Sequence, residues 1–169
     1  MSIHYKDTIS PALARLARGV QDKKPILEAM GLQLVSLTQR AFNEAALRPA
    51  PWPAKRDGTP ATLRKNQVLV RSIRITEITT DSVTVATDRP YAAIHQRGGV
   101  IKPKRPDGVL VFEIGGKKIF AKRVVMPARP FFPFVGDRMT DSAQAKIRRV
   151  AEEKIASLAR GTAPGGAVA

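Results

Sequence analysis

Apolar residues recur at steps of three and four in two long segments of the chain. Within residues 25–47 the apolar positions are Leu27, Met30, Leu34, Leu37, Ala41 and Ala45. Near the C-terminus they are Val135, Met139, Ala143, Ile147, Val150, Ile155 and Leu158. This spacing places the apolar side chains along one face of a helix. The pattern therefore predicts two amphipathic helices, and Ser10-Pro11, which suit a helix N-terminus, predict a third, shorter one.

Stretches of β-branched residues between these helices predict two β-hairpins. The first comprises residues 68–79 and 83–85. The second comprises residues 109–114 and 117–125, which are separated by Gly115-Gly116. Two glycines supply the positive φ angles that a tight hairpin turn needs. The order of elements predicts an α+β fold, in which an antiparallel sheet of two hairpins packs with a long helix of the N-terminal half and a C-terminal helix.

The length of 169 residues is that of one domain, which we expect to span residues 1–160. Residues 161–169 are rich in Gly, Ala and Pro and are expected to be disordered. The chain has no cysteine, so a disulfide framework is excluded. No apolar run approaches the roughly 20 residues that span a membrane, and the N-terminus lacks the pattern of a signal peptide. We therefore expect a protein made in the cytoplasm, without a membrane partner.

Positive charge is concentrated in one part of the sequence. The chain has a net charge of +15, and residues 97–129 carry nine Lys/Arg against two Asp/Glu. A field of this sign attracts polyanions or an acidic protein partner. We expect a basic loop near residues 97–108. The candidate contacts with DNA or with an acidic partner are Arg97, Lys102, Lys104, Arg105, Lys117, Lys118, Lys122 and Arg123.

The sequence YAAIHQRGG, residues 91–99, contains one of the two histidines and raises the question of catalysis. The chain lacks a nucleophile elbow, a cysteine nucleophile and a cluster of carboxylates, and two histidines cannot form a multi-histidine metal site. The glycine spacing also differs from that of phosphate-binding loops. No catalytic residue, metal ligand or cofactor site is therefore predicted, and the protein is not expected to be an enzyme.

The same stretch fits a packed structural turn better than a ligand site. We expect the side chains of His95 and Gln96 to hydrogen-bond the backbone of the turn. Gly98-Gly99 would let the chain reverse with positive φ angles. The residues assigned to this turn, which directs the basic loop, are Tyr91, His95, Gln96, Gly98 and Gly99.

Two further segments are typical either of core packing or of a partner anchor. Trp52 lies between two prolines in a charged loop, residues 48–66, where it would plug the edge of the core or bind a partner. Residues 126–134, MPARPFFPF, place an arginine and three phenylalanines in a chain stiffened by proline. The candidate packing or interaction residues are Trp52, Pro127, Arg129, Pro130 and Phe131.

Two of these motifs together resemble the phage virion morphogenesis family, the tail-completion proteins of Mu-like and related tailed phages. They are YAAIHQRGG and, before the closing helix, MPARPF at residues 126–131. Trp52-Pro53 and the strand opening VLVRSIRI, residues 68–75, also look like segments of that family, and the likeness spans residues 25–158. The chain departs from the family pattern in its more basic segment between residues 97 and 123, and in Val70-Arg71, where a glycine is expected.

The resemblance implies a structural virion protein without a cofactor. Such proteins act at the head–tail junction, where they complete the tail so that filled heads can join it. The resemblance also implies a homo-oligomeric ring of six subunits in the virion tail or neck, with the tail tube, tail terminator and head–neck proteins as partners. In such a ring the basic loop would contact DNA in the channel or dock on an acidic partner. The alternative is a stand-alone protein that binds nucleic acid without sequence preference.

Overall fold

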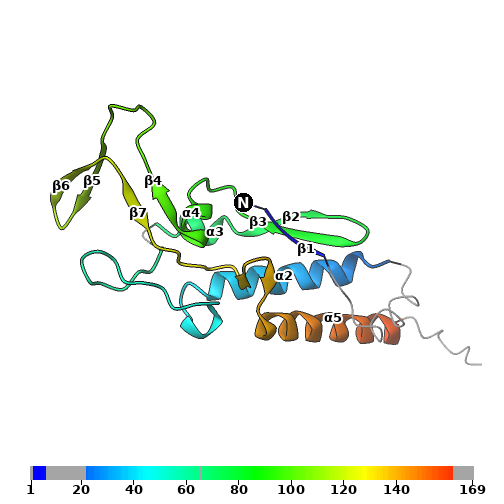
Figure 1. The fold of residues 1–169 in the computed structure, drawn as a ribbon. Coiled ribbons are helices and arrows are strands. Elements are labelled where there is room, and N and C mark those ends of the chain that lie inside the picture. The colour runs from blue at the N-terminus through cyan, green and yellow to red at the C-terminus, as the bar shows by residue number, and fades with distance from the viewer. Residues whose placement is uncertain (1, 7–21, 65, 162–169) are drawn as a thin grey trace, which may run out of the picture.

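The computed structural model describes residues 2–6, 22–64 and 66–161 (Figure 1). Its helices are α2 (Lys24–Arg40), α3 (Val68–Arg71), α4 (Ala92–Arg97) and α5 (Asp141–Gly161), with a 3-10 turn, η1, at Ala45–Leu47. Its strands are β1 (Ser2–Lys6), β2 (Arg74–Ile78), β3 (Ser82–Ala86), β4 (Gly99–Ile101), β5 (Leu110–Ile114), β6 (Lys117–Ala121), β7 (Val124–Met126), β8 (Phe134–Val135) and β9 (Arg138–Met139). Helices combined with antiparallel strand pairs confirm the predicted α+β class.

The body of the protein consists of one sheet and two helices in three layers (Figure 1). The antiparallel sheet has the strand order β1-β3-β2. Helix α2 packs on this sheet with one side and on α5 with the other. The buried residues of α5 follow the predicted helical spacing and are Ala143, Ile147, Ala151 and Ile155. The core therefore lies on both sides of α2.

Helix α2 approaches the sheet closely at Gly31. A Cβ atom at this position would lie 2.6 Å from Cγ2 of Val83 and 2.8 Å from Cδ1 of Ile75. Both distances are shorter than van der Waals contact, so a larger residue would force the side chains of Val83 and Ile75, or the helix itself, to move. Glycine inside a helix costs about 1 kcal/mol relative to alanine. The close packing of helix on sheet offsets that cost.

A two-stranded arm, residues 99–126, projects from the body (Figure 1). At its base β4 pairs with β7, and at its tip β5 pairs with β6. Ile101 pairs with Val124, and Leu110 pairs with Ala121, so the two ribbons follow one another along the same hairpin. Residues 102–109 are inserted on one of the two strands. The second predicted hairpin is therefore present, and it forms the tip of the arm.

The first long helix is shorter than the predicted range of residues 25–47. Helix α2 ends at Arg40, and the chain continues into η1. Arg48 folds back, and its guanidinium donates to the carbonyl oxygens of Ala41 at 2.7 Å and Phe42 at 3.3 Å. These bonds satisfy carbonyl groups that a longer helix would have bonded along its axis.

The first predicted hairpin strand, residues 68–79, begins as a helix. Residues 68–71 form α3, which buries Leu69, and β2 starts at Arg74. Ser72 follows the helix, and its Oγ donates to the Leu69 carbonyl at 2.7 Å and pairs with Oγ1 of Thr87 at 2.6 Å. Hydrogen bonds between a hydroxyl and nearby backbone groups compete with strand pairing. They override the strand preference of the valines in this segment.

Two further boundaries also differ from the prediction. The C-terminal helix begins at Asp141, because Val135 and Met139, which fit its predicted apolar face, lie in β8 and β9. The basic loop begins at residue 102 and not at 97, because Arg97 ends α4 and the next residues pair as β4.

Some expectations concern parts of the chain outside the described residues. These are the predicted helix that begins at Ser10-Pro11 and the expected tail from residue 162 onward. Gly161, the first residue of that expected tail, is instead the last residue of α5. Strand β1 was not predicted at all, although it forms one edge of the sheet.

Candidate interaction site

The segment of residues 126–134 is held to α4 by the side chain of Gln96. Its Oε1 accepts hydrogen bonds from the backbone N–H groups of Phe131 and Phe132, each at 3.0 Å, and its Nε2 donates to the Phe132 carbonyl at 3.3 Å. Phe131 and Phe132 are fully buried, and Gln96 is nearly so. Gln96 therefore bonds a distant segment, and not the backbone of its own turn as predicted. This geometry brings the two sequence motifs into direct contact.

Arg129 joins the same segment to the loop that carries Trp52. Its Nε donates to the Pro53 carbonyl and its Nη2 to the Ala54 carbonyl, both at 2.8 Å, and its backbone N–H donates to the His95 carbonyl at 2.6 Å. The side chain is buried, and within the described residues it has no carboxylate partner. Arginine suits this role because its planar guanidinium presents several donors in a fixed geometry.

Trp52 closes the edge of the core next to this segment. Its Nε1 donates to the Pro130 carbonyl at 2.8 Å, and its ring meets that of Phe42 edge to face at 5.7 Å between centroids. The guanidinium of Arg48 lies 3.9 Å from the centroid of the Trp52 ring, within the range of a cation–π contact. These contacts occupy the indole N–H and both the edge and a face of the ring. This environment matches that of a core plug, the first of the two predicted roles.

His95 lies beside these contacts. We call them the joint: the hydrogen bonds by which Gln96, Arg129 and Trp52 connect α4, residues 126–134 and the loop that carries Trp52. The ring of His95 meets that of Tyr91 edge to face at 6.0 Å between centroids. Its Nδ1 is buried and has no hydrogen-bond partner within the described residues, so the predicted bond to the turn backbone does not form at this atom. Burial, and then the positive charge of Arg129, lower the pKa of His95 below its ordinary value. His95 is therefore neutral at physiological pH.

Gly98 lets the backbone after α4 approach the segment of residues 126–134. Its φ is +71°, and the φ of Gly99 is +146°, so the positive angles expected at both glycines are observed. A Cβ atom at Gly98 would lie 2.8 Å from the backbone nitrogen of Ala128 and 2.9 Å from the carbonyl oxygen of Met126. Backbone atoms cannot rotate away as a flexible side chain can. Glycine is therefore required here both for its conformation and for its lack of a side chain.

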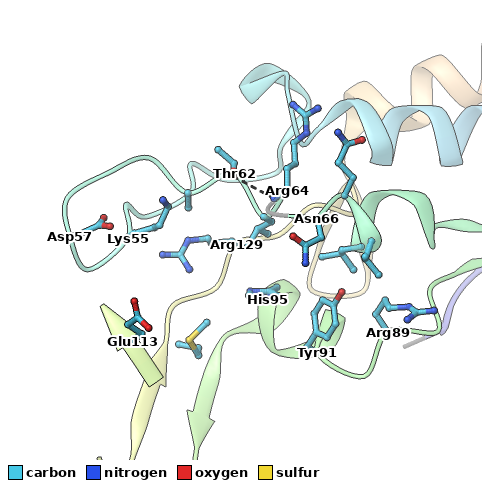
Figure 2. Close-up of a pocket in the computed structure, with 16 residues that line it drawn as sticks. Lys55, Asp57, Thr62, Arg64, Asn66, Arg89, Tyr91, His95, Glu113 and Arg129 are labelled. Atoms are coloured by element: carbon cyan, nitrogen blue, oxygen red, sulfur yellow. Dashed lines mark hydrogen bonds between the residues drawn. The ribbon is translucent and has the colours of Figure 1, made fainter. Parts of the chain in front are cut away.

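A cavity of about 920 Å³ opens beside His95, between α4, residues 55–64 and 66–69, and the arm (Figure 2). Lys55, Asp57 and Glu113 lie toward one end of the view, and Tyr91 and Arg89 lie toward the other. Asp57 accepts hydrogen bonds from the backbone N–H and hydroxyl of Thr59, which lower the pKa of Asp57.

Two arginines at this cavity also have partners within the chain. The Nε of Arg89 lies 2.7 Å from a carboxylate oxygen of Asp88, and Arg64 donates to the side-chain carbonyl of Asn43. Charges of both signs line the cavity, and several of them are engaged within the chain. The cavity is therefore lined by charged side chains that are partly hydrogen-bonded within the chain, as is typical of a structural contact between segments.

The predicted contact residues take no part in the hydrogen bonds of the joint, and all eight are exposed. Arg97 ends α4, and the others occupy the arm: Lys102, Lys104, Arg105, Lys117, Lys118, Lys122 and Arg123. The ion pairs within the described residues involve none of them. Lys122 donates from Nζ to the carbonyl oxygen of Asp107 at 3.4 Å. The arm therefore presents a group of cations to its surroundings.

Exposed apolar side chains of the arm were missed by the sequence prediction. Val111 lies opposite Phe120 on the β5–β6 pair, and Val100 lies opposite Val125 on the β4–β7 pair. All four are exposed, and Phe120 remains 65% exposed. The signal was present in the sequence VLVFEI, residues 109–114, because apolar residues occupy both alternating faces of that strand. An ordinary surface hairpin would be polar on one face.

Two kinds of site are not found in the described parts of the chain. No three His, Asp or Glu side chains converge there so that they could hold a metal ion. None of the helices there has the length and apolar content needed to cross a bilayer.

Comparison with known proteins places the chain in a family. The model of the phage virion morphogenesis family matches residues 6–156. The "Mu-like prophage FluMu G protein 2" of Haemophilus influenzae is 32% identical over 132 residues, which cover 78% of this chain and 80% of the relative. No solved structure matches the chain significantly. The extent of both matches shows that this chain belongs to the phage virion morphogenesis family.

Proposed function

We propose that this protein completes the phage tail at the neck, where it allows filled heads to join. Family membership supports a structural role in virion morphogenesis. The observation that carries the finer proposal is the arm, which projects from the body (Figure 1). The arm also exposes both cations and apolar cross-strand pairs. A protein that acts alone gains nothing from such a surface, because exposed apolar area favours association.

In this proposal the working form is a ring of six copies at the head-proximal end of the tail. Its neighbours are the tail tube, the tail terminator and the head–neck proteins. In a ring, each copy presents its arm to the neighbouring proteins in the same way, so the weak binding of each single arm adds up over the copies. The joint around Gln96 and Arg129 supports this role because it fixes the base of the arm to the core.

A second candidate function is sequence-independent DNA binding. The exposed cations of the arm favour it, since phosphate contacts require positive side chains and no base readout. This function predicts tight binding of duplex DNA by the purified protein, with affinity that falls steeply as salt increases. Weak binding with little dependence on salt would exclude it.

Deletion of the gene tests the structural role. A lysogen that lacks it should accumulate filled heads and tails that remain separate in electron micrographs, and its infectious titre should fall. Plasmid-borne wild-type protein should restore the titre, and so should the His95→Ala variant, because no chemistry at His95 is needed. A normal titre from the deletion strain would refute the proposal. Quantitative mass spectrometry of purified particles would test the ring, with six copies per tail as the expected stoichiometry.

A further inference from the structure

A groove of about 870 Å³ runs between the arm and residues 54–56. Its apolar lining comes mainly from the arm and consists of Ala54, Ile101, Leu110, Val111, Phe112, Ile114, Val124, Val125, Met126 and Pro127. Its charged lining consists of Lys55, Arg56, Arg123 and the buried Arg129. Within the described residues no carboxylate lines it. The groove thus has an apolar floor and a rim of one charge.

The backbone of the arm is also incompletely paired. Strands β4 and β7 form a sheet of two strands, and so do β5 and β6. Each of these strands is therefore an edge within the described residues. A two-stranded ribbon is only marginally stable in water and is stabilised by a third strand or by packing on another surface. Edge strands accept an added strand through their free backbone groups.

We propose that this groove binds an extended segment of another virion protein, whose apolar side chains cover the floor and whose carboxylates pair with Lys55, Arg56 and Arg123. The segment would add a strand to the arm. The proposal rests on the proposed role in assembly, because the partner is taken to be another component of the particle. It assigns the arm to a protein contact and not to DNA.

Charge complementarity argues against a second copy of this chain as the occupant. The chain carries 29 Lys and Arg against 14 Asp and Glu, so its own surface offers few carboxylates to a rim of cations. Several carboxylates that a copy could offer are already paired with cations of the same chain: Asp81 with Lys23, Glu44 with Arg40, Asp88 with Arg89, and Glu153 with Arg149. A partner with unpaired carboxylates suits the rim better.

The apolar floor argues against DNA as the occupant. Cations at the rim would pair with phosphates, but a sugar–phosphate backbone would leave the side chains of Val111, Phe112 and Val125 without an apolar surface to meet. Apolar residues in a protein segment would remove them from water. The combination of floor and rim is the pattern of a protein interface, with an apolar centre and a charged periphery.

Photocrosslinking in assembled particles tests the occupant directly. The photoreactive residue p-benzoylphenylalanine replaces Val125, which lines the groove and is exposed, in a deletion strain complemented with the full-length protein. Val111 is the second position, in case the first variant does not fold. The control position is Leu32 on α2, which is similarly exposed. We expect one dominant crosslink from the groove positions to a different virion protein, within a segment of apolar and acidic residues, and not from Leu32.

Charge reversal at the rim provides the matched functional test. The double variant Arg56→Glu/Arg123→Glu should lower the yield of this crosslink by about tenfold, because two attractive contacts become repulsive. The control double variant Arg71→Glu/Arg148→Glu changes the net charge equally at exposed positions outside the groove and should leave the yield unchanged.

Three results would overturn the groove assignment: a dominant crosslink to a second copy, a dominant crosslink to DNA, or equal loss in both double variants. If one of these results is found and the deletion strain still lacks joined particles, the groove assignment is wrong but the assembly role stands. A normal titre from the deletion strain would instead remove the assembly role itself.

Discussion

Replacing Gln96 with alanine should destabilise the protein strongly, because this side chain satisfies backbone groups of another segment. The variant leaves the N–H groups of Phe131 and Phe132 without an acceptor in the core. The Phe132 carbonyl keeps a partner, the N–H of Phe134 at 2.8 Å. A buried donor left unpaired costs about 1–3 kcal/mol, so the two N–H groups together cost about 2–6 kcal/mol. That is a large part of the total stability of about 5–15 kcal/mol expected for a domain.

Urea unfolding followed by tryptophan fluorescence measures this loss. Trp52 is the single tryptophan of the chain, and its Nε1 bonds to Pro130, which precedes the two phenylalanines. The control is Gln33→Ala on α2, a half-buried helical position where the change should stay within about 0.5 kcal/mol. A loss at Gln96 below about 1 kcal/mol, the contribution of one ordinary hydrogen bond, would show that Gln96 does not hold the segment.

Three further predictions concern the same joint. Gly98→Ala should unfold at lower urea than Gly58→Ala, because both glycines have positive φ but only Gly98 would bring a Cβ against backbone atoms. Arg129→Lys should lower the unfolding midpoint, since one ammonium cannot replace the planar guanidinium at two carbonyl groups, and Arg56→Lys is the exposed control. The wild type should lose stability relative to His95→Gln as pH falls below about 6.5, because the lowered pKa means that the unfolded chain takes up the proton first. Equal urea midpoints within either pair of variants, or a pH-independent difference between wild type and His95→Gln, would contradict the corresponding prediction.

The α+β class and the tip of the arm could be predicted because they depend on local patterns. Alternating apolar residues around Gly115-Gly116 predict the β5–β6 hairpin, and the pair forms as expected. The apolar spacing that starts at Leu27 likewise predicts the helix that becomes α2. Local periodicity is sufficient to predict an element from sequence when its pairing strand is close in sequence or when its buried face is one continuous stripe.

The remaining boundaries depend on side chains distant in sequence or on tertiary contacts. The end of α2 is fixed by Arg48, seven residues beyond the Ala41 carbonyl that it bonds. The strand β1 forms because it pairs with β3, about eighty residues later, and nothing in its five residues indicates that partner. Sequence patterns contain no information about such long-range pairing.

The candidate site was predictable in its composition but not in its bonding. The sequence predicts a packed turn at residues 91–99 and either core packing or a partner anchor at residues 126–134, but it does not predict that Gln96 reaches across 35 residues in sequence to the N–H of Phe131. The cations of the arm were identified from charge alone and are exposed. The groove was missed because it requires residues 54–56 to lie beside the arm, and that arrangement follows from the hydrogen bonds of Arg129.

Cryo-electron microscopy of the neck of the purified virion is the most direct test of the proposed assembly role. We predict density for this fold as a ring at the head-proximal end of the tail, with each arm covered by an extended segment of a neighbouring protein. Absence of the protein from mature particles that still carry joined heads and tails would contradict the account.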